Sequence, residues 1–387
     1  MEPITREELF LAAAGGAFDG DLPTPVTRQE QYLYQIKSLC DSLQNDIAAV
    51  GRTAVSSWQG IQAIVRAGLA SKVFSIGDQL TCQRGGVNLV WDIIGIDHDT
   101  PADSQYTHSL TLQLHDCFPD TMQYDAPEAF YYASAEMAAG TYHFTVGSTD
   151  YQFTLSSAVP AGGQLMLTYS GDTPSSVSVS TAKGGTAAGS IAVSAGNEGT
   201  ELTSLNAVRR IRYGWNNYRN SAIRQWLNSS AAAGSVWTPQ TDYDRPPAWA
   251  AGKAGFLNGM DRDFLDVVGT TAITVVKNRV SDGGGTETLN DQFFLLSRSE
   301  VYGSMEGGND EGAPYPYYAE HSDLSEAGMG SDTNRMKAVN GSSQPVWLRT
   351  PEYGSEHWVR AVSGVNGSIT TDSAEKSKGI APACNII

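Results

Sequence analysis

The closing segment of the chain, WLRTPEYGSEHWVRAVSGVNGSITTDSAEKSKGIAPACNII (residues 347–387), says most about the fold. Its ends, WLRTP and GIAPACNII, are apolar blocks: Trp347 and Leu348 favour burial, Arg349 needs a carboxylate or carbonyl partner, and Pro351 ends a strand. Between them, EYGSEHW and SITTDSAEKSK mix aromatic, charged and hydroxyl side chains with no steady hydrophobic period. Such mixtures are typical of adaptable contact surfaces. We expect frame strands that hold a displayed surface, with a plain polar loop as the alternative.

The composition predicts a folded, β-rich protein. The 387 residues are 41% hydrophobic, which is enough to build cores, and 40 glycines with only 17% charged residues indicate short strands and many turns. The net charge of -17 would repel phosphate backbones and anionic headgroups, so neither nucleic acid nor a membrane is an expected partner. We also expect neither a signal peptide nor a transmembrane helix, and therefore synthesis in a cytosol.

The reactive residue types are scattered, so we expect no enzyme, metal or cofactor. The cysteines form no C-x-x-C pair, and buried free thiols are expected at Cys40, Cys82, Cys117 and Cys384. The six histidines form no H-x-x-x-H pattern, and there is no Gly-rich phosphate loop or G-x-S-x-G elbow. Two acidic groups could bind a cation, with a solvated turn or no ligand as the alternative: Asp97, Asp99 and Asp103, and Asn309, Asp310 and Glu311.

An internal repeat near the N-terminus predicts two helix starts within a first segment, residues 1–32. PITREELFL (residues 3–11) and PVTRQEQYL (residues 25–33) both carry the T-x-x-E capping box. In this box the Thr oxygen accepts one backbone amide and the Glu reaches back to another. The two pairs are Thr5 with Glu8 and Thr27 with Glu30.

From Leu33 onward, apolar residues at heptad spacing predict a helical coiled-coil stalk over residues 33–70. One seam position holds Leu33, Cys40, Ile47, Ala54 and Ile61, and the other holds Ile36, Leu43, Val50, Ser57 and Ile64. If the helix is continuous, the seam from Leu33 to Ile64 would measure roughly 48 Å, and its mixed Ile and Leu composition suits a trimer at least as well as a dimer. The alternative is two amphipathic helices packed on the following domain, with a break near Gly51 or Gly60.

After residue 71 the pattern changes to strands, beginning with KVFSIGDQLTC and VNLVWDIIGIDHD. Residues 139–203 contain short strands between Gly, Pro and Ser, which predicts a small β-rich insert. SLNAVRRIRYGWNNYRNSAIRQWLN predicts helices, whereas ITVVKNRV, QFFLLSRSEVYG, VWLRTP, WVRAVSG and GIAPACNII predict strands. The expected fold class is α+β, with a head domain formed by residues 71–138 and 204–387.

Several of these motifs, in this order, resemble a phage and prophage domain family with a C-type-lectin-like fold, related in shape to formylglycine-generating enzymes. The motifs are VFSIGDQ, VWDIIGID, IRQWLN, YDRPP, GFLNGMDRDF, FFLLSRSEVYG, and VWLRTP through GIAPACNII. The two P-[IV]-T-R-x-E-x-x-L copies also resemble attachment and trimerisation segments of phage head-fibre and tail-fibre proteins. The enzymatic activity is not implied, because Cys384 is a lone cysteine and the copper-binding pair of those enzymes is not evident.

Some members of that fold family are targets of diversity-generating retroelements, in which adenine-directed mutation varies surface residues near the C-terminus on a fixed scaffold. The closing segment has the matching layout. By this resemblance, the candidate ligand-binding positions are Glu352, Tyr353, Ser355, Glu356, His357, Trp358, Asn366, Ser368, Thr370, Asp372, Ser373, Glu375 and Lys376.

These features together favour a phage or prophage virion fibre or decoration protein, exposed on the particle surface. In this hypothesis the N-terminus docks to capsid or tail proteins, the stalk forms a homotrimer, and the head binds a glycan or protein ligand on a cell surface. A bacterial surface or secreted lectin-like adhesin is the alternative, and the expected lack of an export signal speaks against it. An enzyme is the third hypothesis and would require a metal or an activated cysteine.

Overall fold

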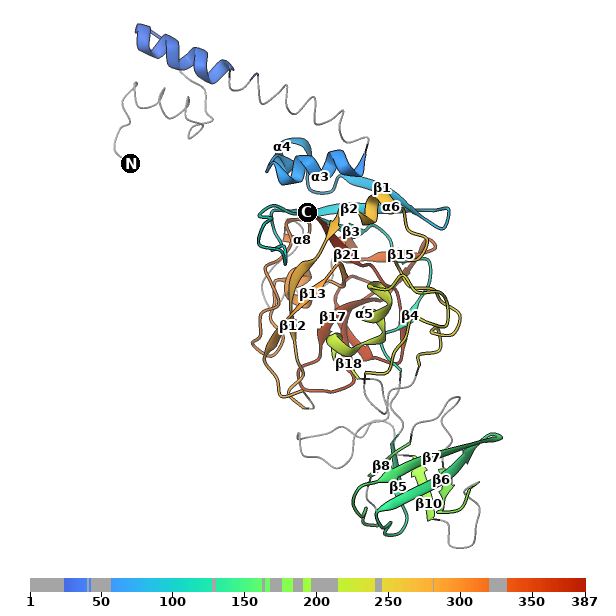
Figure 1. The fold of residues 1–387 in the computed structure, drawn as a ribbon. Coiled ribbons are helices and arrows are strands. Elements are labelled where there is room, and N and C mark those ends of the chain that lie inside the picture. Colours follow the sequence, from blue (N-terminus) through green and yellow to red (C-terminus); the bar gives the residue numbers. More distant parts are fainter. Residues whose placement is uncertain are drawn as a thin grey trace. The chain divides into compact units, whose positions relative to one another are not determined.

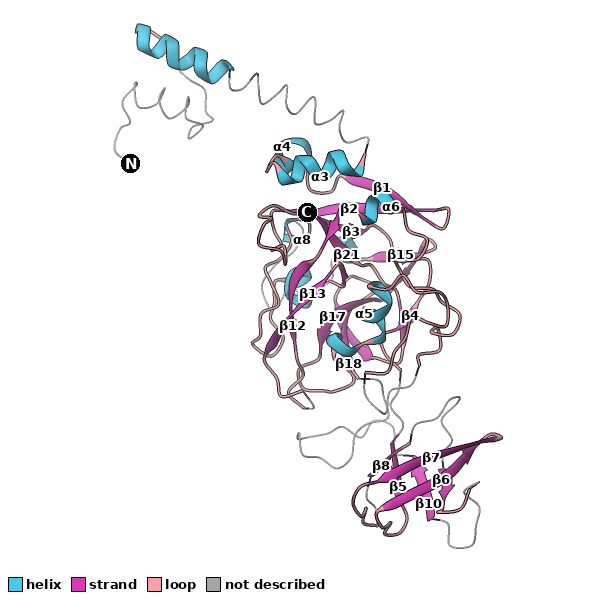
Figure 2. Cartoon of the chain, viewed as in Figure 1, coloured by secondary structure: helices cyan, strands magenta, loops and turns pink. Residues whose placement is uncertain are grey.

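The computed structural model describes residues 24–39, 42, 57–126, 130–161, 164–167, 176–183, 191–195, 215–240, 246–280, 282–319 and 333–387. The chain divides into two compact units, residues 1–74 and residues 75–387, and each is described by itself (Figure 1). Figure 2 shows many short strands in the second unit, with short helices between them. The fold class is mixed α+β with several small antiparallel sheets.

The first unit contains a helix over 28–39 that starts as the repeat predicted. The Glu30 backbone amide donates to Thr27 Oγ1 at 3.1 Å, and the Thr27 amide donates to Glu30 Oε2 at 3.0 Å. The second capping box is therefore confirmed. The first box, Thr5 with Glu8, lies outside the described residues.

The predicted stalk seam is not one uninterrupted helix. Along the first helix, apolar side chains are exposed at steps of four and three residues: Tyr32, Ile36 and Leu39. The next helix, α3 (Trp58–Arg66), starts afresh at Ser57, whose ψ of 150° is extended and whose side chain accepts from Gly60 N. The prediction of a single rod is therefore wrong at Ser57. No coiled coil is evident in the described part of the first unit, and the seam positions from 40 to 54 lie outside it.

The later seam residues are already buried within the chain. Ile61 and Ile64 on α3 are 3% and 7% exposed. The helix ends at a left-handed Gly68, with φ of 69°, and the amide of Leu69 returns to the carbonyl of Ile64. A second short helix, α4 (Ala70–Val73), follows. For α3, this matches the alternative of an ordinary amphipathic helix.

The second unit is organised around a six-stranded antiparallel sheet in which the last strand of the chain is central (Figure 1). The strands are β1 (Gln79–Arg84), β2 (Val87–Ile96), β3 (Leu110–Leu114), β21 (Ala383–Ile386), β11 (Val268–Gly269) and β14 (Phe293–Phe294). The Trp91 ring is fully buried, and its centroid lies 5.4 Å from that of Phe264. Residues 380–387 are all buried, which confirms that GIAPACNII is part of the frame.

A three-stranded sheet carries most of the closing segment: β17 (Val346–Pro351), β18 (Trp358–Val362) and β19 (Ile369–Ser373). β17 is buried along its whole length, as expected for WLRTP. Three further strand pairs lie in the second unit: β12 (Thr271–Val276) with β13 (Thr286–Asp291), β15 (Lys337–Val339) with β16 (Ser342–Gln344), and β20 (Ser377–Lys378) with β4 (Met122–Gln123).

Short helices connect these strands. They are η1 (Tyr218–Asn220), α5 (Ala222–Leu227), α6 (Arg262–Leu265), α7 (Arg298–Tyr302), α8 (Pro316–Ala319) and η3 (Thr333–Arg335). α5 is the helix expected at IRQWLN, and it buries Ile223 and Trp226. The strand prediction for QFFLLSRSEVYG is wrong in its second half. There, Ser297 and Glu300 form a capping box that starts α7, and this local signal outweighs the β-branched and aromatic composition.

The β-rich insert has strands of its own and a compact cluster of apolar side chains. Its strands are β5 (Phe130–Ala133), β6 (Gly140–Val146), β7 (Thr149–Leu155), β8 (Gln164–Met166), β9 (Ser176–Val179) and β10 (Ile191–Ala195). Phe144, Leu167 and Val179 are fully buried in that cluster. Because β5 pairs with both β8 and β10, the sheet begins at residue 130, before the expected boundary at 139.

Cys82, Cys117 and Cys384 are free and buried, as predicted, whereas Cys40 lies outside the described residues. Burial raises the pKa of the Cys82 and Cys117 thiols to about 12. None of the helices described is long and apolar enough to cross a membrane.

Candidate functional site

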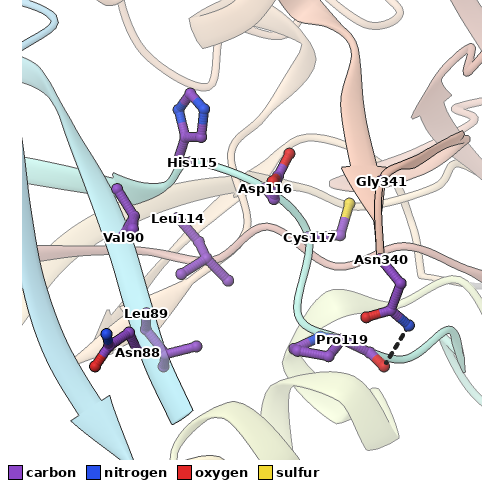
Figure 3. A pocket seen from close by; sticks show the side chains of 10 residues that line it. All are labelled: Asn88, Leu89, Val90, Leu114, His115, Asp116, Cys117, Pro119, Asn340 and Gly341. Carbon is purple, nitrogen blue, oxygen red and sulfur yellow. Dashed lines mark hydrogen bonds between the residues drawn. The ribbon is translucent and has the colours of Figure 1, made fainter.

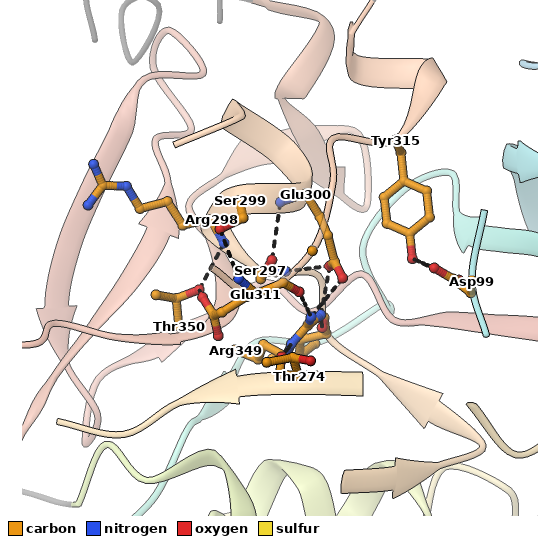
Figure 4. A network of polar contacts seen from close by, with 12 residues as sticks. Asp99, Thr274, Ser297, Arg298, Ser299, Glu300, Glu311, Tyr315, Arg349 and Thr350 are labelled. Atoms are coloured by element: carbon orange, nitrogen blue, oxygen red, sulfur yellow. Dashed lines mark hydrogen bonds and ion pairs between the residues drawn. The ribbon is translucent and has the colours of Figure 1, made fainter. Parts of the chain in front are cut away.

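The frame beneath the closing segment is held by a buried arginine on β17. Arg349 is 0% exposed, and its Nη1 and Nη2 donate to the two carboxylate oxygens of Glu300, each at 2.7 Å (Figure 4). The same guanidinium donates to the carbonyls of Thr274, Leu295 and Glu311. All five donors of a guanidinium can be satisfied in this way, which is what burial of the charge requires.

A second buried carboxylate completes this network. Glu311 accepts from the Thr350 hydroxyl and from the Val276 amide. Burial raises the pKa of Glu311 to about 7, although the positive charge of Arg349 acts to lower it. The predicted cation group around it does not form, because Glu311 turns inward while Asp310 caps its own turn by accepting from Gly312 N.

The other predicted cation group also does not converge. The Asp99 side chain is 11% exposed and accepts from the Tyr315 hydroxyl at 2.9 Å (Figure 4). It also accepts from Asn385 Nδ2 at 2.7 Å. Burial raises its pKa, but hydrogen bonds and the charge of His98 outweigh burial, so the pKa lies below its ordinary value. Asp97 and Asp103 instead accept bonds from their own loops. Among the described residues, no group of three potential metal ligands is found.

The loop between β17 and β18, residues 352–357, is fixed by hydrogen bonds to its main chain. Asn216, which is 0% exposed, donates from Nδ2 to the Ser355 carbonyl at 2.7 Å and to the Trp358 carbonyl at 2.8 Å. Its own backbone amide donates to the Glu356 carbonyl at 2.9 Å. Asn278 holds the Asn216 side chain in place by donating to its Oδ1 at 2.8 Å. The shape of the loop therefore does not depend on most of its own side chains.

Four of the predicted ligand-binding positions are buried, which corrects the expectation that they are displayed. Ser355, Glu356, His357 and Ser373 are 3%, 6%, 2% and 7% exposed. The Ser355 hydroxyl accepts from the backbone amides of His357 and Trp358 and lies 3.0 Å from His357 Nδ1, so these side chains close the loop from inside. Burial lowers the pKa of His357 to about 4, which keeps the ring neutral at neutral pH.

The strand register separates the remaining predicted positions onto two faces of the sheet. Trp358 pairs with Ser373 and Arg360 pairs with Thr371, so Trp358, Arg360 and Thr371 share one face. Thr370 and Asp372 pair with the fully buried Ala361 and Val359 and belong to the opposite face. Asp372 there forms an ion pair with Lys378 at 2.7 Å. We call Trp358, Arg360 and Thr371 the β18–β19 strip.

Arg360 in the β18–β19 strip is held rigidly by Glu306. Arg360 Nε donates to Glu306 Oε2 at 2.6 Å and Nη2 donates to Oε1 at 2.8 Å. Glu306 also accepts from Arg298 Nη1 at 2.6 Å and from the Tyr353 amide at 3.1 Å. Burial raises the pKa of Glu306, but the hydrogen bonds and charges of the two arginines outweigh it and leave the pKa below its ordinary value.

The other predicted positions lie around this strip or on the next turns. The ring of Tyr353 is half-buried and lies close to the backbone of Gly284 and Gly307, so it supports two loops. Asn366 accepts from the amide and hydroxyl of Ser368 and closes its own turn. Glu352 is half-buried, and Glu375 and Lys376 form an ion pair at 3.0 Å in which Lys376 is exposed.

Sequence reasoning missed four residues of this surface: Arg298, Glu306, Arg360 and Thr371. The alternation in WVRAV does place Arg360 on the same side as Trp358, and this signal was available. Nothing local indicates Glu306, which lies 54 residues before Arg360 in the chain.

A separate pocket of about 210 Å³ lies between β2, the end of β3 and the β15–β16 turn (Figure 3). Leu89, Leu114 and Pro119 supply apolar lining, and Asn340 Nδ2 donates to the Pro119 carbonyl at 3.5 Å. None of the predicted ligand-binding residues lines it.

Comparison with known proteins gives one match. Residues 199–387 match a family described as a domain of unknown function, DUF6273. No curated protein and no solved structure matches the chain. The matched region includes the buried Arg349 network, the anchored loop and the β18–β19 strip.

Proposed function

We propose that the chain is a phage or prophage virion fibre or decoration protein, whose head has a C-type-lectin-like fold and binds a ligand on a cell surface. The observation that carries this proposal is a displayed Trp358, 40% exposed, at the end of a loop whose main chain is fixed from beneath by Asn216. A large aromatic side chain left exposed on a rigid support is typical of a binding surface.

The anchoring of the loop also supports a surface that tolerates sequence variation. Because Asn216 bonds to carbonyl groups, substitutions at half-buried or exposed positions leave those bonds intact. Of the positions implied by the retroelement layout, Glu352, Trp358 and Lys376 fit this requirement, whereas the buried Ser355 and His357 fit it poorly. Diversification therefore centres on the accessible positions in this proposal.

A homotrimer formed through the N-terminal helix is part of the proposal. The exposed stripe of Tyr32, Ile36 and Leu39 has no cover within the described residues, and three heads on one particle would gain avidity for a repeated ligand. Sedimentation velocity of the full chain tests this. Ile36→Asp is expected to give monomers, while Ser38→Asp on the opposite side keeps the trimer; a monomeric wild-type chain would contradict it.

The virion role is tested by fractionation. Particles induced from the strain that encodes the chain are banded on a density gradient, and the fractions are probed with an antibody against the chain. Co-banding with packaged DNA is expected. Recovery only in the cell envelope or in particle-free medium would favour the second candidate, a bacterial surface or secreted lectin-like adhesin.

A further inference from the structure

We infer that the β18–β19 strip binds an uncharged saccharide ring, with Trp358 as the stacking platform and Arg360 and Thr371 as the hydrogen-bonding groups. The inference rests on the proposed function, since it names the ligand class of the same surface.

The three groups lie close enough to contact one small ring. Trp358 and Arg360 are alternate residues of β18, so their Cα atoms are roughly 7 Å apart. Arg360 and Thr371 are direct cross-strand partners, and side chains in such pairs are about 5 Å apart at Cβ. An aromatic face bordered by polar donors suits a sugar ring, because a pyranose presents C–H groups on its face and hydroxyls at its edge.

Arg360 is a preorganised donor with capacity left for a ligand. Its Nε and Nη2 bind Glu306, whereas Nη1 has no hydrogen-bond partner among the described residues. The Thr371 hydroxyl likewise has none in the part of the chain that the structure describes. Glu306 accepts four bonds, which uses the acceptor sites of both its oxygens, so it acts as a positioning residue through Arg360.

The surroundings favour a saccharide over a protein. Protein-binding patches usually have a desolvated core of several aromatic and aliphatic side chains. In the described part of the second unit, the large apolar side chains that are exposed are Val87, Met305, Trp358 and Val365. Only Trp358 among them is aromatic, and hydrogen-bonding side chains surround it on the sheet, so the surface offers one platform rather than an apolar core.

The local charge favours an uncharged ring over an acidic one. Arg360 and Arg298 share the carboxylate of Glu306, and Glu352 adds a second negative charge. Burial lowers the pKa of Arg360, but the charges of Glu306 and Glu352 outweigh burial and raise it. These four side chains sum to zero charge, in a chain whose net charge is -17. A carboxylate or sulfate on the ligand would gain little attraction here and would meet the general field of an acidic protein.

The test uses the fluorescently labelled full chain on intact cells of the strain to which the particles adsorb. The cells are treated with periodate, which cleaves vicinal diols of saccharides, with proteinase K, or with buffer alone. In parallel, the chain is applied to a printed array of neutral and acidic oligosaccharides. The variants are Trp358→Ala, Arg360→Lys and Thr371→Val, with Arg262→Ala as the control, because the Arg262 side chain is 86% exposed and is not one of the candidate binding positions. The melting temperature of each variant is recorded.

We expect periodate to reduce cell binding at least tenfold, proteinase K to leave it unchanged, and neutral glycans to give the array signal. Trp358→Ala and Arg360→Lys should each reduce binding at least tenfold, Thr371→Val should reduce it about three- to tenfold, and Arg262→Ala should not change it. Glu306→Gln should weaken glycan binding while Glu306→Asp restores part of it, which a purely structural role would not produce.

The remaining outcomes separate the two proposals. Binding that is sensitive to proteinase K, resistant to periodate and lost in Trp358→Ala would mean a protein ligand, which overturns the saccharide inference and leaves the proposed function standing. Selective binding of acidic glycans would overturn the uncharged ligand class. Unchanged binding by a folded Trp358→Ala variant would overturn the β18–β19 strip as the site. A wild-type chain that binds neither cells nor array would overturn both proposals.

Discussion

The arginines of two bidentate arginine–glutamate pairs lie on the neighbouring strands β17 and β18, and the two pairs differ chiefly in burial. Arg349 with Glu300 is buried, with side chains 0% and 6% exposed, and the arginine also donates to three backbone carbonyls. Arg360 with Glu306 is open on one side, because the arginine side chain is 20% exposed and keeps an unused donor group. The same chemistry thus stabilises the frame at one position and presents a hydrogen-bond donor at the other.

This difference explains how the closing segment can combine a fixed frame with a displayed surface. The charge of Arg349 is compensated on every side, so replacing it leaves buried partners unpaired. The charge of Arg360 remains in contact with solvent, and Glu306 keeps Arg298 if Arg360 is lost. Stability should therefore respond strongly to changes at the first pair and binding to changes at the second.

The largest effect is expected from Arg349→Met. It leaves the Glu300 carboxylate buried without its partner, and we expect the free energy of unfolding to fall by about 3–5 kcal/mol. The matched variant Arg360→Met should cost about 1 kcal/mol or less. Urea unfolding of both full-length variants measures the difference, and equal losses would contradict the contrast between the pairs.

A smaller effect is expected at the loop that supports Glu306. Gly307 has φ of +57°, and a Cβ atom there would lie 2.3 Å from Tyr353 Cδ1, so we expect Gly307→Ala to cost about 2–3 kcal/mol. Gly308→Ala is the control, because its φ of +78° is equally strained but nothing lies within 4 Å, and it should cost about 1 kcal/mol. Urea unfolding of both variants measures the loss in free energy of unfolding. Equal costs would mean that Tyr353 does not constrain this loop.

The pH dependence of stability should reveal the buried imidazole of His357. Burial lowers its folded pKa from 6.5 to about 4, so the neutral ring stabilises the fold above pH 6.5 and this contribution is lost as the pH falls toward 4. Between pH 8 and pH 5 we expect a loss of about 1–2 kcal/mol that His357→Gln removes. Urea unfolding of both proteins at the two pH values gives the difference. Identical pH dependence in the two proteins would show that His357 titrates normally.

The sequence predicted the frame better than the surface. The apolar composition of WLRTP and GIAPACNII predicts their burial. The second capping box predicts a helix start because all of its residues are close together in the sequence. Ser355 and His357 could not be recognised as buried, because their loop is held by Asn216, more than a hundred residues earlier in the chain. Polar composition indicates a surface only while no distant partner covers it.

The same limit applies to the register and the stalk. The layout predicted Trp358, Thr370 and Asp372 on one displayed face, but the pairing of β18 with β19 places the last two opposite Trp358. A single strand shows its own alternation, whereas the phase between two strands depends on the turn that joins them. In the predicted stalk, heptad spacing continues through Ser57, but this serine has an extended backbone and caps the start of α3.

The central claim, that a rigid frame displays Trp358 as the binding residue, is tested most directly by one comparison. The full chain and its Trp358→Ala variant are measured side by side for binding to intact cells and for thermal unfolding. We predict that cell binding falls at least tenfold, while the free energy of unfolding changes by less than about 0.5–1 kcal/mol because the ring is displayed and the loop is held by its main chain. A variant that binds as well as the wild type, with unchanged stability, would contradict the claim.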